Sequence, residues 1–572
     1  EHQSEYIAPY AKRREWISGF SGSAGTAVIT QEKAALWTDG RYHIQANAEL
    51  TPRDEWVLMK EGLPGSPTLG QWLLSQCQTS DKIGFDARLL SQRQNSILQH
   101  ELQPKELVLT PIKPNLIDQI RSDERPPLPL STAFVHPIER SGVSSAEKIR
   151  AIREHLKTTG ADLLVASALD EICWVLNVRG SDITNTPVII SYLIVTPNTA
   201  VWFVSDSQLS PEIHAHLKEG GVTTQPYEDF HSYLQNIEGQ RALVNDLRCG
   251  ASVYFALKQR GMDLVENDFI TEQKSIKNNV ELEGIKNCHK HDAVAVVSLL
   301  HWLENKLEKG EVVTEYDVAE KAEQLRSQQK DYVSLSFDTI SGSGPNGAII
   351  HYKPNKESAA TVTKDKLFLL DSGGQYLGGT TDVTRTVHFG IPTEHEKLCN
   401  TLVLKGHINL ATTIFPPGTT GIRLDSFARQ ALWKYGLDYR HGTGHGVGAF
   451  MNVHEGPHGL SYRETKKFPF KPGMTITIEP GYYEEGNFGI RIENLLIVKH
   501  VKTPFMFAGS PSLGFENITC IPIQTKLVDA SLLEQSEIKW LNDHNQWCLD
   551  TLSPLIQSDD ILQWLKNECL PI

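Results

Sequence analysis

The sequence of 572 residues lacks the features that define several protein classes. No uncharged apolar run approaches the ~18 residues that are needed to cross a bilayer, so an integral membrane protein is excluded. Basic residues are in the minority, 55 against 69 acidic ones, and the formal net charge of −14 argues against a general nucleic-acid binder. Hydrophobic residues make up 40% and charged residues 22%, which is ordinary for a soluble globular protein and excludes a disordered, collagen-like or coiled-coil chain.

Cysteine is scarce and scattered, with eight residues and no CxxC pair. We therefore predict mostly free thiols in a reducing compartment. The C-terminal residues LKNECLPI lack the hydrophobic tail of a lipid-anchor signal. Together these features favour a cytoplasmic protein. The chain starts at Glu1 rather than at Met, so a secreted form with a signal before Glu1 stays open as the alternative.

Two stretches of the first half resemble each other, residues 13–42 and residues 169–206. Each contains a tryptophan, a glycine-containing break and two β-rich runs around a polar turn, which is typical of a β-hairpin. We interpret them as two copies of one α/β domain. A charged, proline-rich linker at residues 123–127 follows the first copy, and a polar segment at residues 271–279 follows the second.

Helix signals are clear at two places. Ser144 and Glu147 form a capping-box pattern, and Gly160 supplies a stop signal, which predicts a helix between them. Apolar residues recur with helical spacing over residues 280–307, which predicts a long helix there.

Three familiar motifs fail because of their context. Residues 454–458 (HEGPH) are a literal HExxH, but that motif binds zinc only on a helix, which the proline forbids. Residues 342–347 fit a dinucleotide-binding pattern, yet we expect residues 348–352 to continue as a strand rather than as the helix that such a site needs. Residues 444–449 fit a looser version and also lack a following helical pattern. A zinc-peptidase helix and a nicotinamide site are therefore disfavoured.

Four carboxylates and one histidine stand at the ends of apolar runs or in glycine-rich segments: Asp371, Asp382, His445, Glu479 and Glu493. Each one alone is read more simply as a turn or loop residue, but five in this order favour a metal site. Burying them unpaired would be costly, and a pair of divalent cations would neutralise them. Ligation rich in oxygen and poor in nitrogen favours two Mn²⁺ ions, with Zn²⁺ or Co²⁺ as alternatives.

The segments DSGGQYLGGTTDVTRT, HGTGHGVG, VHEGP, IEPGYY and GIRIEN together resemble the aminopeptidase P (Xaa-Pro aminopeptidase) family of pita-bread metallopeptidases. The resemblance extends over essentially the whole chain and is greatest to the long, three-domain eukaryotic cytosolic type. It implies an α/β (α+β) fold, in which two creatinase-like N-terminal α/β domains at residues 1–127 and 128–276 precede a pita-bread catalytic domain with a C-terminal extension at residues 277–572. The likeness begins inside the family's first domain, so we expect that domain to lack its first strand and helix.

The resemblance also implies a role for each metal-site residue. Asp371 would chelate one metal, His445 and Glu479 the other, and Asp382 and Glu493 would bridge both. A metal-bridging hydroxide would then be the nucleophile, because two cations acidify water and polarise the scissile carbonyl. Glu479 would carry the proton from that water to the leaving amine.

Three further histidines match family positions around the substrate: His351, His441 and His454. By the resemblance they would bind and orient the peptide and stabilise the oxyanion of the tetrahedral intermediate, although from the sequence alone an ordinary structural role is as good a reading of each. The implied reaction is hydrolysis of the N-terminal Xaa-Pro bond of peptides with proline at the second position, which releases one amino acid. The long members of the family imply a homodimer.

Two alternatives to this function stay open. A prolidase would act on Xaa-Pro dipeptides alone, and the extra N-terminal domain favours the aminopeptidase over it. A metal-free pita-bread module would bind proteins instead of cleaving peptides, and a creatinase-type amidinohydrolase would also lack the metals. Both of these would have lost the ligands, whereas all five stand in this sequence.

Overall fold

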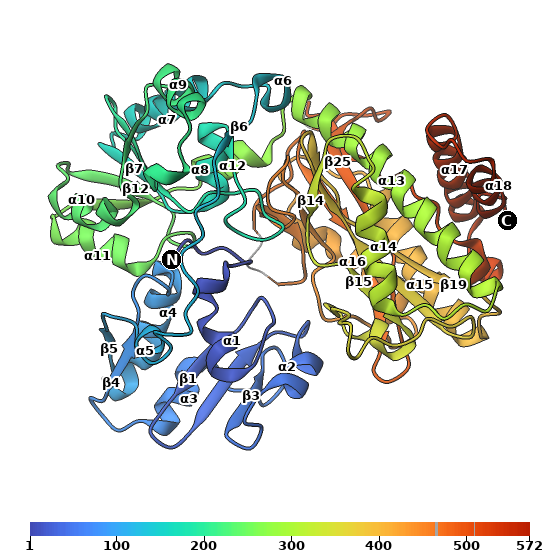
Figure 1. Ribbon diagram of the computed structural model, residues 1–572, viewed down its shortest axis with the longest axis horizontal. Coiled ribbons are helices and arrows are strands. Elements are labelled where there is room, and N and C mark those ends of the chain that lie inside the picture. The colour runs from blue at the N-terminus through green and yellow to red at the C-terminus, as the bar shows by residue number, and fades with distance from the viewer. Residues whose placement is uncertain (464–466, 508) are drawn as a thin grey trace. The chain divides into compact units, whose positions relative to one another are not determined.

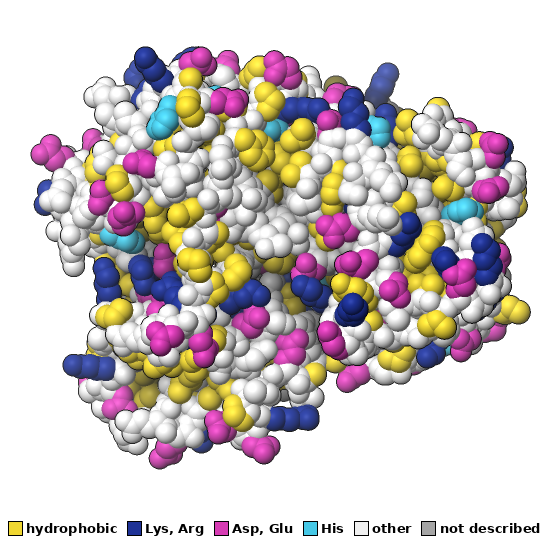
Figure 2. Space-filling model, in the orientation of Figure 1, with side chains coloured by type: hydrophobic (Ala, Val, Ile, Leu, Met, Phe, Trp, Pro, Cys, Tyr) yellow, Lys and Arg dark blue, Asp and Glu magenta, His cyan; other side chains and the backbone are white. Residues whose placement is uncertain are grey.

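The computed structural model describes residues 1–463, 467–507 and 509–572, which form two compact units, residues 1–274 and residues 275–572 (Figure 1). None of the helices in these described ranges is both long and apolar enough to span a membrane. The eight cysteines form no disulfide, in agreement with the predicted free thiols. On the face drawn in Figure 2, acidic and basic side chains are interspersed.

The second half of unit 1 is built on one mixed sheet with the strand order β11-β10-β9-β7-β12-β13. Its strands are β7 (Leu163–Ala166), β9 (Tyr192–Val195), β10 (Ala200–Phe203), β11 (Thr223–Gln225), β12 (Arg241–Val244) and β13 (Asp263–Glu266). Strands β9 and β10 form the antiparallel hairpin that the sequence predicts there, and β7 lies between β9 and β12. Buried side chains such as Val165, Ile194 and Phe203 fill the core beside this sheet.

The first half of unit 1 repeats the same elements in two separate sheets. Strands β1 (Thr26–Ile29), β2 (Ala34–Thr38) and β3 (Trp56–Lys60) form one sheet, in which β1 and β2 are the predicted hairpin. Strands β4 (Lys82–Phe85) and β5 (Val108–Pro111) form the other. Within the described residues, no strand joins these two sheets in the way that β7 joins β9 to β12.

Twelve α-helices, four short 3₁₀-helices and a two-stranded ladder complete unit 1 in the described residues. The helices are α1 (Arg13–Ser18), α2 (His43–Glu49), α3 (Leu69–Gln76), α4 (Gln92–Leu102), α5 (Leu116–Ile120), α6 (Ile138–Ser141), α7 (Ser145–Thr159), α8 (Leu169–Leu176), α9 (Pro211–Glu219), α10 (Phe230–Asn236), α11 (Ala251–Gln259) and α12 (Phe269–Ser275), and the ladder pairs β6 (Phe134–Val135) with β8 (Val178–Arg179). Helix α7 confirms the predicted capping box of Ser144 and Glu147, and Gly160 ends it in the left-handed conformation.

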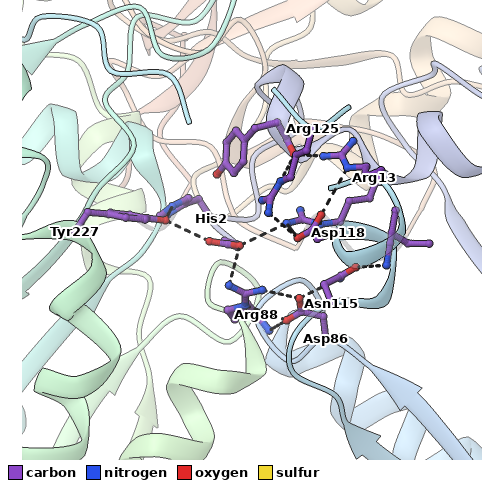
Figure 3. A network of polar contacts seen from close by, with 12 residues as sticks. His2, Arg13, Asp86, Arg88, Asn115, Asp118, Arg125 and Tyr227 are labelled. Atoms are coloured by element: carbon purple, nitrogen blue, oxygen red, sulfur yellow. Dashed lines mark hydrogen bonds and ion pairs between the residues drawn. The ribbon is translucent and has the colours of Figure 1, made fainter. Parts of the chain in front are cut away.

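Polar contacts join the two halves of unit 1. His2 Nδ1 donates to the carbonyl oxygen of Ser167 (2.8 Å), and His2 Nε2 lies 2.9 Å from the hydroxyl of Tyr227 (Figure 3). Burial lowers the pKa of His2 to about 3, so the ring is neutral at neutral pH. Arg93 on α4 donates to Asp246 of the second half (2.6 Å). The two halves are therefore linked by side chains as well as by the chain itself.

Unit 2 contains several small antiparallel sheets, with the orders β14-β17-β18, β15-β16-β19, β20-β21, β22-β25-β26 and β23-β24. Their strands are β14 (Tyr332–Leu335), β15 (Ile340–Ser343), β16 (Leu367–Ser372), β17 (Gly374–Tyr376), β18 (Gly379–Thr380), β19 (Val383–His388), β20 (Gly444–Gly446), β21 (Glu455–Leu460), β22 (Thr475–Ile478), β23 (Gly481–Glu484), β24 (Phe488–Arg491), β25 (Asn494–Val501) and β26 (Ser512–Asn517).

Six α-helices complete unit 2 within the described residues. They are α13 (Asn279–Glu308), α14 (Glu315–Arg326), α15 (Glu394–Ala411), α16 (Gly421–Trp433), α17 (Gln535–Leu552) and α18 (Asp559–Glu568). Helix α13 matches the predicted long helix to within a residue, and Figure 1 shows it beside α14. Leu300 of α13 packs in one buried cluster with Phe368 of β16 and Val383 of β19, so the helix supports strands that approach the site described below.

For two of the three discarded motifs, the structure confirms that the helix which the motif would need is absent. The HEGPH segment contributes to strand β21 rather than to a helix, and no helix follows residues 444–449. The strand expected at residues 348–352 is wrong. Gly344 has a φ of 54° and Pro345 follows it, so the chain turns into the 3₁₀-helix η5 (Gly344–Ala348) and then into a further turn.

Candidate metal centre

The fold brings together the five residues that the sequence predicts as metal ligands. They lie on separate elements: Asp371 in β16, Asp382 between β18 and β19, His445 in β20, Glu479 directly after β22, and Glu493 between β24 and β25. Ligand atoms of Asp371, Asp382 and Glu493 lie within 4.8 Å of one another, as do those of His445, Glu479 and Glu493. These two sets share Glu493 and contain all five residues.

Strand register explains why carboxylates so far apart in the sequence meet. In the antiparallel pair β22–β25, Ile478 lies opposite Asn494. Glu479 directly follows one strand and Glu493 directly precedes the other, so the register places the two carboxylates at the same end of the ladder. In the pair β16–β19, Asp371 lies opposite Thr384, two residues beyond Asp382.

A glycine allows the histidine strand to approach β22. A Cβ atom on Gly444 would lie 1.8 Å from the carbonyl oxygen of Thr477, a distance that no side chain could tolerate. The next residue, His445, donates its backbone N–H to Thr477 Oγ1 (3.0 Å). The glycine-rich motif is thus required by the close packing of two backbones.

The ring of His445 is oriented for ligation. Its Nδ1 donates to the carbonyl oxygen of Gly446 (2.9 Å), which leaves Nε2 directed at the carboxylates. Nε2 lies 3.4 Å from Asp382 Oδ2 and 3.4 Å from Glu479 Oε1. A backbone carbonyl that fixes one ring nitrogen is the usual support for a metal-binding histidine.

The electrostatics of the cluster fit bound cations. Burial, and then the neighbouring Asp371 and Glu479, raise the pKa of Asp382 well above its ordinary value. Burial, and then Asp382, do the same to the pKa of Glu493, and burial raises the pKa of Glu479 to about 7. Asp371 Oδ1 is buried and has no hydrogen-bond partner within the described residues. Four carboxylates thus share Arg491 as their nearby cation, and divalent ions would supply the missing positive charge.

A chain of hydrogen bonds connects the carboxylates to one of the predicted substrate histidines. Arg491 donates from Nη2 to Asp371 Oδ2 (2.6 Å) and from Nη1 to the hydroxyl of Tyr483 (2.7 Å). His441 Nδ1 donates to the carbonyl oxygen of Gly442 (2.7 Å), and its Nε2 lies 2.9 Å from the Tyr483 hydroxyl oxygen. Burial raises the pKa of Tyr483 to about 12, which keeps that hydroxyl protonated.

The other two predicted histidines differ in their placement. The rings of His454 and His445 meet edge to face with centroids 4.3 Å apart, and His454 has a nitrogen within 4.8 Å of ligand atoms of Asp382 and His445. His454 therefore lies within reach of a metal ion. His351 lies half-buried in the turn after η5, a segment that packs against β24.

Sequence reasoning missed three residues that support the cluster: Tyr483, Arg491 and Thr384. The Thr384 hydroxyl donates to Glu493 Oε2 (2.8 Å) and accepts from Arg491 Nε (3.1 Å), so it connects a predicted ligand to the arginine. One signal was available in the sequence. Arg491 interrupts an apolar run, and a buried guanidinium requires a buried anion.

The chain matches family models along nearly its whole length. Residues 283–500 match metallopeptidase family M24, and residues 511–572 match the C-terminal region of the M24 peptidases. Residues 5–122 and residues 124–281 each match a creatinase/prolidase N-terminal domain. These matches confirm the predicted order of two creatinase-like α/β domains and a pita-bread domain, while the predicted bounds of the three domains stay predictions.

Curated relatives are similar over the full chain. The sequence is 46% identical to the probable Xaa-Pro aminopeptidase P of Laccaria bicolor, with 100% of this chain and 90% of the relative covered. It is 44% identical to aminopeptidase P2 of Arabidopsis thaliana, with 100% and 84% covered.

Solved structures of two enzymes are also similar to this chain. X-prolyl aminopeptidase from Caenorhabditis elegans, described as a cytosolic enzyme with a di-nuclear active site, matches with a TM-score of 0.95 and 39% identity over 100% of this chain and 94% of its own. The Xaa-Pro dipeptidase from Bacillus anthracis matches with a TM-score of 0.53 and 23% identity over 67% and 99%, and this likeness concerns the fold alone.

We expect Glu493→Ala to lower the metal content of the protein, because Glu493 contributes to both ligand sets. The measurement is elemental analysis of protein that has been loaded with Mn²⁺ and desalted. Glu485→Ala, which removes an exposed carboxylate, is the matched control and should keep the metal of the unaltered protein. Full metal occupancy in Glu493→Ala would remove Glu493 from the ligand set.

Proposed function

On the premise that this chain belongs to metallopeptidase family M24, we propose that it is an aminopeptidase that removes one N-terminal residue from peptides with proline in second place. The observation that carries this proposal is the buried cluster of four carboxylates and one histidine, whose unbalanced charge suits a pair of divalent cations. Similarity over the whole chain to relatives named probable Xaa-Pro aminopeptidase P and aminopeptidase P2 supports the substrate class.

In this proposal, two divalent cations would be held by Asp371, Asp382, His445, Glu479 and Glu493. Manganese is the preferred metal and zinc or cobalt the alternative, because oxygen donors dominate the set. Such ions, when bound, acidify water and polarise a peptide carbonyl. Glu479 would carry a proton from the attacking water to the leaving amine.

Recognition of proline follows from what its peptide bond lacks. The Xaa-Pro bond has no N–H to donate, and the ring fixes φ, so peptidases that grip that N–H are unsuited to it. His351, His441 and His454 are proposed to contact the peptide. Tyr483 would hold His441 in the orientation that its hydrogen bond defines.

Localisation and assembly complete the proposal. A cytosolic site of action is supported by the likeness to the nematode enzyme that is described as cytosolic. A homodimer is proposed from the resemblance to the long members of the family.

We expect sedimentation velocity at micromolar concentration to give one species with twice the mass of the chain, and a single monomeric species would refute this assembly.

The decisive experiment is cleavage of Arg-Pro-Pro beside the dipeptide Arg-Pro, with Mn²⁺ present and after treatment with a chelator. We expect free arginine to be released from the tripeptide, lost on chelation and restored by Mn²⁺. Cleavage of the dipeptide alone would establish a prolidase instead. A folded protein that binds no metal and cleaves neither peptide would support the metal-free binding module.

His454→Ala separates substrate contact from metal ligation. We expect kcat for Arg-Pro-Pro to fall by about 10²- to 10⁴-fold, the range for removing one group that stabilises charge or transfers a proton. Metal content by elemental analysis should stay at the level of the unaltered protein. If metal is lost together with activity, His454 is a ligand, which its distance from Asp382 and His445 would allow.

A further inference from the structure

Glu455 of the literal HExxH segment forms a buried ion pair with a lysine outside the segment, and neither residue is among the five predicted metal ligands. Lys277 Nζ and Glu455 Oε1 form a hydrogen-bonded ion pair, and each side chain is only 1% exposed. Lys277 Nζ also donates to the carbonyl oxygen of Ser275 (3.3 Å). A buried ion pair is weak evidence for stability, because the cost of removing both charges from water offsets their attraction. A role in fixing geometry is therefore the better reading of this pair.

The lysine end of the pair is fixed to the start of strand β22. The backbone N–H of Lys277 donates to the carbonyl oxygen of Gly473 (3.0 Å), and Ile276 pairs with Met474 in an isolated β-bridge. The same strand ends immediately before Glu479. The ammonium group thus belongs to the framework that positions one of the proposed ligands.

The glutamate end of the pair lies beside the proposed substrate histidine. Glu455 pairs with Gly446 in the β20–β21 ladder, and it follows His454 directly in the chain. His454 in turn contacts the ring of His445. His454 lies in the bend that leads directly into β21, so fixing Glu455, the first residue of that strand, also fixes the end of the bend that carries His454.

The second histidine of the motif has a different role. His458 is fully buried and donates from Nε2 to the carbonyl oxygen of Thr475 (2.7 Å) on β22. It therefore binds strand β21 to strand β22 away from the reacting groups. The three polar residues of the motif therefore have different places: His454 lies at the metal centre, Glu455 binds Lys277, and His458 joins two strands.

We propose that Lys277 and Glu455 are positioning residues, whose buried ion pair fixes the start of β21 and so holds His454 against the metal centre. The pair does not touch substrate or metal in this assignment and acts only through His454. The inference rests on the proposed function, because its principal readout is cleavage of a peptide.

The test is the charge-free double variant Lys277→Met with Glu455→Gln, which leaves no unpaired buried charge. We expect it to fold, to bind Mn²⁺ in calorimetry with the stoichiometry and affinity of the unaltered protein, and to have KM for Arg-Pro-Pro within about twofold. Its kcat should fall about a hundredfold, since a displacement of ~1 Å at a catalytic group costs that much. An unchanged kcat would overturn the proposal.

Action through His454 is tested by a double-mutant cycle. In the His454→Ala background the same two substitutions should cause no further loss of kcat, because the group that they position is gone. An equal fractional loss in both backgrounds would show a general structural effect and overturn the proposal. Should the double variant fail to fold, Glu455→Gln alone, which keeps the side-chain length and a hydrogen-bond acceptor, carries the same cycle with a smaller loss.

A second, partly buried ion pair supplies the control. Lys405 Nζ and Glu537 Oε2 lie 2.5 Å apart between α15 and α17, with side chains 18% and 8% exposed. Lys405→Met with Glu537→Gln removes the same charges and should leave kcat unchanged.

If the unaltered protein cleaves neither peptide, the proposed function fails, and a crystal structure of the Lys277/Glu455 double variant then decides the inference. A displaced His454 ring would support the positioning role, and an undisplaced ring would refute it.

Discussion

The crowding of four carboxylates in a buried space is the constraint on which unit 2 depends. Asp371, Asp382, Glu479 and Glu493 repel one another, and burial removes the water that would screen them. The fold counters this repulsion with the guanidinium of Arg491, and the imidazoles of His445 and His454 lie beside the carboxylates. The residual negative charge favours the binding of cations, so the feature that destabilises the metal-free cluster is also the one on which the proposed chemistry depends.

The supporting contacts explain how this crowding is kept in one geometry. Thr384 and Arg491 hold carboxylate oxygens by hydrogen bonds, and Gly446 holds the back of the imidazole. Tyr483 extends the same network outward to His441. The site is thus a continuous polar network on rigid strands, in which the ligands are oriented before any ion arrives.

The sequence predicts what is local and misses what is distant. The helix after Ser144 and the ends of α13 follow from capping and periodicity, and the five predicted ligands stand at the ends of apolar runs or in glycine-rich segments. The contacts between Arg491 and Asp371 join residues 120 positions apart, which no local pattern encodes. The strand expected after Gly344 is wrong because a positive φ reverses the chain, a backbone property that a pattern of apolar residues does not reveal.

Each half of unit 1 is one copy of a repeated α/β domain, but the two halves together form one compact body. In the second half β7 completes one six-stranded sheet, whereas in the first half β1 and β4, as described, pair on one side only. The two halves are also joined by side-chain contacts such as His2 with Ser167 and Arg93 with Asp246. The 274 residues of unit 1 are therefore expected to melt as one cooperative body rather than as two repeats.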